Sequence, residues 1–171
     1  QLSELEQSPY PYVLKIQDKV KELLAQHRSS IFDTWLEQDK ISCLPNYKFP
    51  SVISPPTFTT MVPKSLYTAE EDMNKYEFKV VWGLSELGNV KWWHRNISKR
   101  GFQINGPVHA YPDIIVMLHS GKILMVETKG DQLDNDESKE KAKIGDQWAR
   151  LAGKQYKYYM VFETKQPNYP G

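Results

Sequence analysis

Two acidic residues and one lysine flank a pair of short apolar runs in the middle of the chain. Asp113 directly precedes the run Ile114–Leu118, and Glu127 and Lys129 follow the run Ile123–Val126. A short turn separates the runs, so this stretch predicts a β-hairpin with two largely buried strands. The start of one strand then lies beside the end of the other, which brings Asp113 near Glu127. Because side chains alternate along a strand, Glu127 and Lys129 share one face.

This convergence of charge at the end of an apolar hairpin suits metal-dependent chemistry. Two desolvated carboxylates repel each other, and burying the pair is costly unless a cation compensates. Lys129 supplies one positive charge, and a divalent metal can supply the rest, since Mg²⁺ prefers hard oxygen ligands with room for waters and a phosphate. A structural ion-pair cluster is the alternative, because short motifs recur by chance. Pro112 before the aspartate and Gly130 after the lysine make the motif more specific.

The spacing of these residues resembles a known nuclease motif. Pro112-Asp113, thirteen intervening residues and then Glu127-Thr128-Lys129 are similar to the PD-(D/E)xK nuclease superfamily, which has the restriction-endonuclease-like fold. The resemblance implies a Mg²⁺- or Mn²⁺-dependent deoxyribonuclease in which Asp113, Glu127 and the backbone carbonyl of Thr128 bind the metal. Lys129 is then expected to orient the attacking water or to stabilise the pentavalent phosphate, rather than to act as a free base.

Three stretches narrow the resemblance further. Residues 89–96, 111–113 and 126–130 are similar to the C-terminal nuclease modules attached to DEAD/DEAH-type helicases and type III restriction subunits. The superfamily resemblance covers about residues 66–165, and the narrower one implies an endonuclease that acts on DNA in a prokaryotic cytoplasm. No ATP-binding loop of the Gly-x-x-x-x-Gly-Lys-Ser/Thr type occurs in the sequence. A helicase or ATPase motor is therefore expected as a partner region upstream of Gln1.

A third carboxylate candidate lies in the helix predicted before the first strand. Thr68 and Glu71 have the spacing of a capping box, so the helix is expected to begin there and to end before the loop at Gly88. Glu77 sits at the border of the apolar stripe of this helix. It is either a solvated helix residue or a third acid that completes the metal shell. Many nucleases of the resembled superfamily use an acid from the first helix, which is the argument for the second role; Glu70 and Glu71 are weaker rivals.

Basic residues beside aromatic ones mark a candidate DNA surface around the first strand. Such a mixture suits the phosphates and base faces of a nucleic-acid strand; the alternative is a set of solvated cations around core tryptophans. At least one of Trp92 and Trp93 is expected to be buried, since strand neighbours point to opposite faces. Lys143 and Gln147, on a later helix, are further candidates, with a solvent-facing role as the alternative for each. The candidates around the first strand are Lys91, His94, Arg95, Lys99 and Arg100.

The remaining elements follow from apolar periodicity and turn residues. One helix, or two separated at Ser29-Ser30, is expected between Tyr12 and Leu36. The proline-rich residues 41–63 are expected to cross the surface of a domain in an extended conformation, and the acidic residues 131–137 to form a solvated turn. The other expected elements are a strand over Val90–Asn96, a helix over Ser138–Leu151 with apolar residues Ile144, Trp148 and Leu151 and a close contact at Gly145, and a strand over Tyr156–Glu163.

This order of elements predicts the fold class. In the second half of the chain it reads α, β, β, β, α, β. A helical crossover between the last two strands favours a mixed sheet covered by helices. The prediction is an α/β domain with a restriction-endonuclease-like αβββαβ core, in which helices flank a mixed four-stranded sheet. Residues 66–171 are assigned to this domain, and residues 1–65 to a helical and proline-rich extension or connector.

Composition limits the class of protein. The 171 residues are 40% hydrophobic and 25% charged, so the chain can bury a core, and no apolar run reaches the roughly eighteen residues of a membrane span. Cys43 is the single cysteine, which fits a reducing cytosolic setting. A net charge of +1 is low for an autonomous DNA binder. The alternative function is therefore a non-cleaving DNA-binding or docking module with the same fold, and RNA or branched DNA stays open as a substrate.

Overall fold

A computed structural model describes residues 10–59, 62–130 and 136–164 of the chain. The chain divides into two compact units, residues 1–42 and residues 43–171. This division falls earlier than the predicted boundary at residue 65, because residues 43–65 pack with the second unit.

The first unit is built on one long helix, α2, over Tyr10–Glu37. The helix continues through Ser29-Ser30, so the break considered at that point is absent. It ends where Asp39 adopts a positive φ of 50° and the amides of Asp39 and Lys40 donate to the carbonyls of Leu36 and Trp35. These bonds satisfy carbonyl groups that the end of a helix leaves without intrahelical donors. Among the described residues, no helix is both long and apolar enough to cross a membrane.

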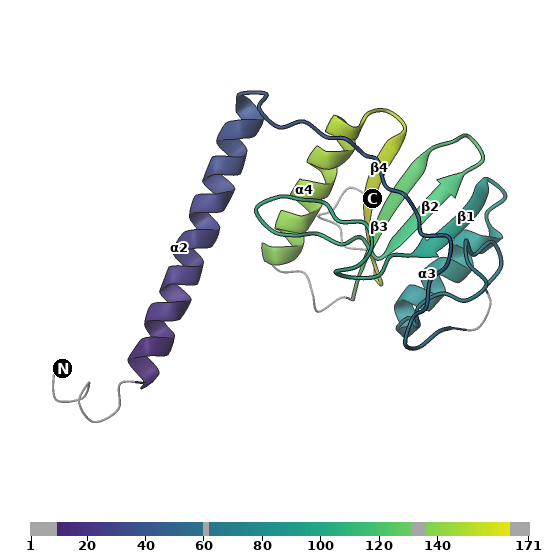
Figure 1. The fold of residues 1–171 in the computed structure, drawn as a ribbon, viewed down its shortest axis with the longest axis horizontal. Helices are drawn as coiled ribbons and strands as arrows, with labels where there is room; N and C mark the ends of the chain where they lie inside the picture. Colours follow the sequence, from purple (N-terminus) through teal and green to yellow (C-terminus); the bar gives the residue numbers. More distant parts are fainter. Residues whose placement is uncertain (1–9, 60–61, 131–135, 165–171) are drawn as a thin grey trace. The chain divides into compact units, whose positions relative to one another are not determined.

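The second unit contains a four-stranded mixed sheet with the strand order β1-β2-β3-β4 (Figure 1). β1 pairs antiparallel with β2, β2 pairs antiparallel with β3, and β3 pairs parallel with β4. The chain enters the sheet after helix α3 and crosses from β3 to β4 through helix α4, as predicted. The bounds are α3 Lys75–Glu86, β1 Val90–Arg95, β2 Ile114–Leu118, β3 Ile123–Lys129, α4 Asp136–Ala152 and β4 Tyr156–Phe162.

The β2–β3 hairpin has the register that the sequence predicted. Ile114 pairs with Val126, so the next position along each strand places Asp113 beside Glu127. The two strands are buried on both faces, as near-continuous apolar runs in a helix-covered sheet should be. The hairpin therefore carries two carboxylates to one end of the sheet.

The two faces of the sheet pack against different helices. One core joins Val81 of α3 to Trp93 of β1 and to Ile114 and Val116 of β2. The core on the other face includes the apolar residues Phe102, Ile104, Ile115, Met125, Ile144 and Trp148. Alternate residues of β2 thus enter opposite cores, which is the period of two expected of a strand. The prediction that at least one tryptophan is buried is confirmed, because Trp93 is fully buried.

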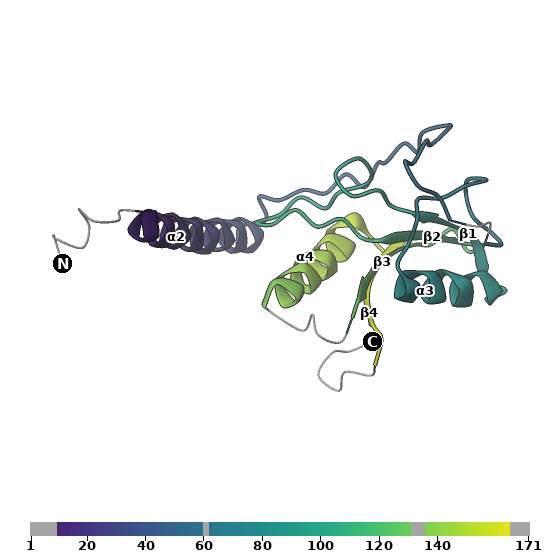
Figure 2. The ribbon, with the colours of Figure 1, turned by 90° about the horizontal axis from the view of Figure 1, so that it is seen from below.

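The extended segment from residue 43 to residue 50 lies across the α4 face of the sheet. Tyr47 and Phe49 pack against that core, and the ring of Phe49 meets Trp92 edge to face. The hydroxyl of Tyr67 donates to the carbonyl of Pro50 at 2.6 Å. Figure 2 shows this segment on the opposite side of β1 and β2 from α3. The prediction of an extended segment packed on a domain surface is therefore confirmed for residues 43–50, whereas Val52 and Phe58 further along the predicted segment are exposed.

Helix α3 begins later than predicted. Its N-cap is Asn74, whose side chain accepts from the amides of Tyr76 and Glu77, while Glu77 accepts from the amide of Asn74. The capping box assigned to Thr68 and Glu71 is thus wrong, and the same spacing occurs six residues further on. The earlier segment cannot be helical because Glu70 is buried against β1 and the amide of Leu66 donates to the carbonyl of Trp93.

Helix α4 packs closely on β4 at Gly145, as predicted, since a Cβ at this position would overlap the ring of Tyr158. Of the three apolar residues predicted to share a stripe of this helix, Ile144 and Trp148 are buried and Leu151 is exposed. The helix ends before Gly153, which has a positive φ of 101° that glycine adopts at little cost.

Replacing Gly145 with alanine is expected to destabilise the protein by about 1–3 kcal/mol through overpacking. This loss exceeds the gain of about 1 kcal/mol that alanine brings to a helix interior. Gly83→Ala in α3 is the matched control, because a Cβ there meets nothing within 4 Å, and it should leave stability unchanged or raise it. Urea unfolding measures both variants, and a Gly145→Ala protein as stable as Gly83→Ala would contradict the packing.

Candidate active site

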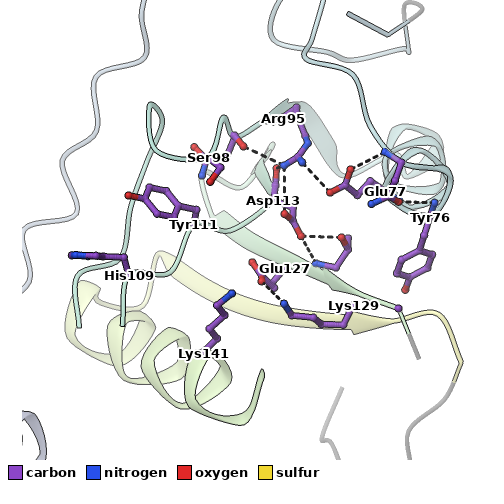
Figure 3. Close-up of a pocket in the computed structure, with 14 residues that line it drawn as sticks. Tyr76, Glu77, Arg95, Ser98, His109, Tyr111, Asp113, Glu127, Lys129 and Lys141 are labelled. Carbon is purple, nitrogen blue, oxygen red and sulfur yellow. Dashed lines mark hydrogen bonds and ion pairs between the residues drawn. The ribbon is translucent and has the colours of Figure 1, made fainter. Parts of the chain in front are cut away.

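A cleft of about 470 Å³ opens where β1, β2 and β3 reach the start of α3 and the side of α4 (Figure 3). The three residues of the predicted motif, Asp113, Glu127 and Lys129, all line it. Their shared position follows from the hairpin register and from strand alternation. The cleft is lined by Asn74, Tyr76, Glu77, Arg95, Asn96, Ser98, His109, Tyr111, Asp113, Glu127, Thr128, Lys129, Gly130 and Lys141.

Asp113 is held in place by the strand opposite. Its Oδ2 accepts hydrogen bonds from the backbone amide of Thr128 at 2.8 Å and from the Thr128 hydroxyl at 2.9 Å. Its Oδ1 lies 3.5 Å from Nη1 of Arg95, at the limit of a hydrogen bond. The Thr128 side chain was not assigned a role from the sequence, yet with its amide it fixes the orientation of this carboxylate.

Glu127 is the most buried acid that faces this cleft, with 5% of its surface exposed. Its Oε1 pairs with Nζ of Lys129 at 2.9 Å, while its buried Oε2 has no hydrogen-bond partner among the described residues. Burial raises the pKa of Glu127 and the negative charge of Asp113 raises it further, while Lys129 opposes the shift. Glu127 is thus an acid whose charge is paired on one oxygen only, and burial and Asp113 favour its neutral form.

Glu77 is buried rather than solvated, and both of its oxygens have partners. Oε2 accepts from the amide of Asn74 in the capping box, and Oε1 pairs with Nη2 of Arg95 at 2.9 Å. Burial raises the pKa of Glu77 and Arg95 partly offsets this shift. In this arrangement Glu77 caps α3 and anchors Arg95, so its oxygens are not directed at the two other carboxylates.

Arg95 links three elements across the cleft. Besides its ion pair with Glu77, its Nη1 donates to the backbone carbonyls of Asp113 at 3.0 Å and of Asn96 at 3.2 Å. Its side chain is only 15% exposed. The residue predicted as a DNA contact is therefore also a structural bridge between α3, β1 and the start of β2.

Replacing Arg95 with methionine is expected to lower the free energy of unfolding by about 2–4 kcal/mol, because it leaves Glu77 buried without its cation. Adding Glu77→Gln should restore part of the loss, since glutamine keeps the cap and removes the charge. Arg150→Met is the control, as that arginine is 76% exposed. A double variant no more stable than Arg95→Met, measured by urea unfolding, would contradict this explanation.

The other candidates for DNA contact lie outside the cleft. His94 is 2% exposed, and its Nδ1 lies 2.8 Å from Oε2 of Glu70. It therefore belongs to the core, and its prediction as a surface contact is wrong in this structure. Gln147 is half-buried, with an Oε1 that has no partner among the described residues. The exposed members of the set are Lys91, Lys99, Arg100 and Lys143.

Lys141 of α4 was missed by the sequence analysis although it lines the cleft (Figure 3). Its spacing could have identified it. Lys141 lies three residues before Ile144 and seven before Trp148, and this spacing places all three on the buried stripe of the helix. Tyr111, Ser98 and His109 also line the cleft, and no periodic pattern marked them.

Metal-binding groups of three or more histidine, cysteine or acidic side chains are absent from the part of the chain that the structure describes. The carboxylate pair Asp113 and Glu127 therefore stands as a two-acid site. Most of the acidic turn considered between residues 131 and 137 lies outside the described residues.

Comparison with known proteins leaves the chain without an assigned relative. No protein-family model matches it, and no curated protein or solved structure matches it significantly. Its function must therefore be argued from the geometry of the cleft.

Proposed function

We propose that the second unit is a metal-dependent DNA endonuclease domain of the PD-(D/E)xK type, with the restriction-endonuclease-like version of its α/β fold. The observation that carries this proposal is the placement of Asp113, directly before β2, beside Glu127 of the adjacent strand β3, with Lys129 next to them in an open cleft. The order of strands and helices is compatible with it. Fold alone does not determine function, so the proposal rests on these three side chains.

The donor set fits a magnesium ion that keeps most of its waters. Mg²⁺ is commonly bound by one or two carboxylates together with substrate phosphate oxygens. Glu127 offers a buried oxygen without a partner among the described residues, and burial together with the negative charge of Asp113 raises its pKa. Asp113 supplies the second carboxylate and Thr128 is proposed to add its carbonyl. Glu77 fits less well, because both of its oxygens are engaged.

A bound Mg²⁺ or Mn²⁺ would lower the pKa of a water and neutralise charge on the scissile phosphate. The chain itself orients the groups around that phosphate. Thr128 fixes the Asp113 carboxylate, and Lys129, held by Glu127, places an ammonium group where it can orient the water or stabilise the pentavalent phosphate. In the proposed hydrolysis the oxygen of a water molecule would bond to the phosphorus and lose a proton to solvent, while the bond to the 3′ or 5′ oxygen on the opposite side breaks and that oxygen takes up a proton.

The parent protein is proposed to be of the helicase or restriction type, with DNA as the partner and a motor region elsewhere in the protein. The exposed basic residues, namely Lys91, Lys99, Arg100 and Lys143, are proposed to contact the DNA backbone outside the cleft. Their phosphate contacts would make binding weaken as salt increases.

A direct test is to incubate the purified chain with plasmid, linear duplex and single-stranded DNA in Mg²⁺, in Mn²⁺ and in EDTA. The expected result is cleavage that needs the metal and the Asp113 carboxylate, and the three substrates would rank its preference. RNA and branched DNA are included as competing substrates. Cleavage that persists in EDTA would contradict the proposal.

A non-cleaving DNA-binding module is the second candidate. The observation in its favour is that Glu77, Asp113 and Lys129 each have partners within the protein, as in a structural charge cluster. Calorimetric Mn²⁺ binding separates the two candidates, because a scaffold has no need of a divalent ion. Absence of binding by a folded protein would favour the scaffold.

A further inference from the structure

Three arginine or lysine side chains line the cleft, and two of them pair with acids that also line it. Arg95 pairs with Glu77, and Lys129 pairs with Glu127. Lys141 differs, because its Nζ pairs at 2.9 Å with Oε1 of Glu137, which does not line the cleft. Figure 3 shows Lys141 rising from α4 toward Glu127.

The ion pair of Lys141 is the one that can be exchanged at least cost. The Glu137 side chain is 66% exposed and that of Lys141 is 21% exposed, so water screens much of their attraction. In contrast, Lys129 and Glu127 are 12% and 6% exposed, and separating them would leave a buried carboxylate without its cation. Of the three cations that line the cleft, Lys141 is therefore the one whose acidic partner a ligand anion can displace at the lowest cost.

The charge state of Lys141 favours an anion. Burial alone lowers its pKa, but the hydrogen bond with Glu137 and the negative charges of Glu127, Glu137 and Asp113 outweigh burial and raise the pKa above its ordinary value. The lysine is thus an ammonium group throughout the neutral range. An ammonium–phosphate contact is a charge-assisted hydrogen bond, which is among the stronger polar contacts.

We propose that Lys141 binds a phosphate of the nucleic-acid substrate and that Glu137 occupies this lysine in the free protein, so that substrate displaces Glu137. The inference rests on the proposed function, for which it names a substrate-binding residue and a competing internal anion. It predicts opposite effects for the two partners of one ion pair. If the ion pair were purely structural, replacing either partner would instead lower the stability of the protein to a similar extent.

The test uses fluorescence anisotropy of a labelled single-stranded oligonucleotide and of a labelled duplex, in EDTA so that no cleavage occurs. Lys141→Gln is expected to weaken binding about tenfold and to reduce the salt slope by about one. Glu137→Gln is expected to tighten binding about threefold, because it removes the competing anion. Lys154→Gln is the matched control, since this exposed lysine lies beyond the opposite end of α4.

A charge-conserving variant and a test of folding distinguish loss of the positive charge from misfolding. Lys141→Arg should bind within about threefold of the wild type, and circular dichroism confirms that each variant is folded. Equal affinities for the wild type, Lys141→Gln and Glu137→Gln would overturn the inference, as would weaker binding by Glu137→Gln.

Cleavage assays on the same proteins separate this inference from the proposed function. If the wild type cleaves DNA in a metal-dependent way and Lys141→Gln has the same KM, the proposed nuclease function is supported and the role of Lys141 is overturned. Binding that depends on Lys141 without any cleavage would support the phosphate contact and overturn the nuclease. A folded wild type that binds neither oligonucleotide would overturn both.

Discussion

Replacing Asp113 with asparagine is expected to reduce metal-dependent DNA cleavage by about three orders of magnitude. A bound metal supplies several kcal/mol of charge stabilisation in the transition state, and each ~1.4 kcal/mol corresponds to a factor of ten in rate. Asparagine keeps the size of the side chain and an oxygen that can accept from Thr128, so the hairpin should stay folded. The lost carboxylate charge is then the main difference between the two proteins.

The measurement is the initial rate of cleavage in Mg²⁺ and in Mn²⁺, with calorimetric Mn²⁺ binding alongside it. Asp146→Asn is the matched control, since Asp146 is an exposed residue of α4 that pairs with Arg150. The control should cleave at the wild-type rate. If the Asp113→Asn protein retains more than about a tenth of the wild-type activity, this carboxylate is not part of the catalytic site.

Replacing Glu127 with glutamine is expected to have two opposite effects. Cleavage should fall as far as in the Asp113 variant, because the second carboxylate is lost. Stability at neutral pH should rise, because a raised pKa means that the folded protein favours the neutral form of Glu127 over the charged form. Glutamine resembles the neutral form of Glu127, which burial and the charge of Asp113 favour, and its carbonyl oxygen can still accept from Lys129.

The sign of the pH dependence follows from the raised pKa of Glu127. Below the ordinary pKa of glutamate the residue is protonated in both folded and unfolded protein, so the variant has no advantage there. As pH rises through the ordinary value and then through the raised folded-state value, the unfolded chain ionises more readily and wild-type stability falls. The advantage of Glu127→Gln should therefore be absent in acid and should grow as the pH rises above the ordinary pKa of glutamate.

Urea unfolding at several pH values, in the absence of divalent ions, measures this difference. Glu163→Gln is the control for loss of a carboxylate, because Glu163 is exposed just beyond β4. A Glu127→Gln protein that is less stable than the wild type at neutral pH would contradict the argument. So would a difference that grows as the pH falls.

The sequence by itself determined the hairpin and the meeting of its charges. Apolar runs separated by a turn specify two buried strands, and the period of two in a strand then decides which residues share a face. These rules placed Asp113 beside Glu127 and Lys129 on the same face as Glu127. They act between residues close in sequence, which is why they needed no knowledge of the rest of the fold.

Tertiary structure alone decided the surroundings of this motif. Two capping boxes compete at the start of α3, and the one at Asn74 is used because the burial of Glu70 holds the earlier segment against β1. That same contact withdraws His94 from the surface. Lys141 enters the cleft only because α4 crosses from β3 to β4 over it. Each outcome depends on contacts between residues distant in sequence, whose energies the local pattern does not contain.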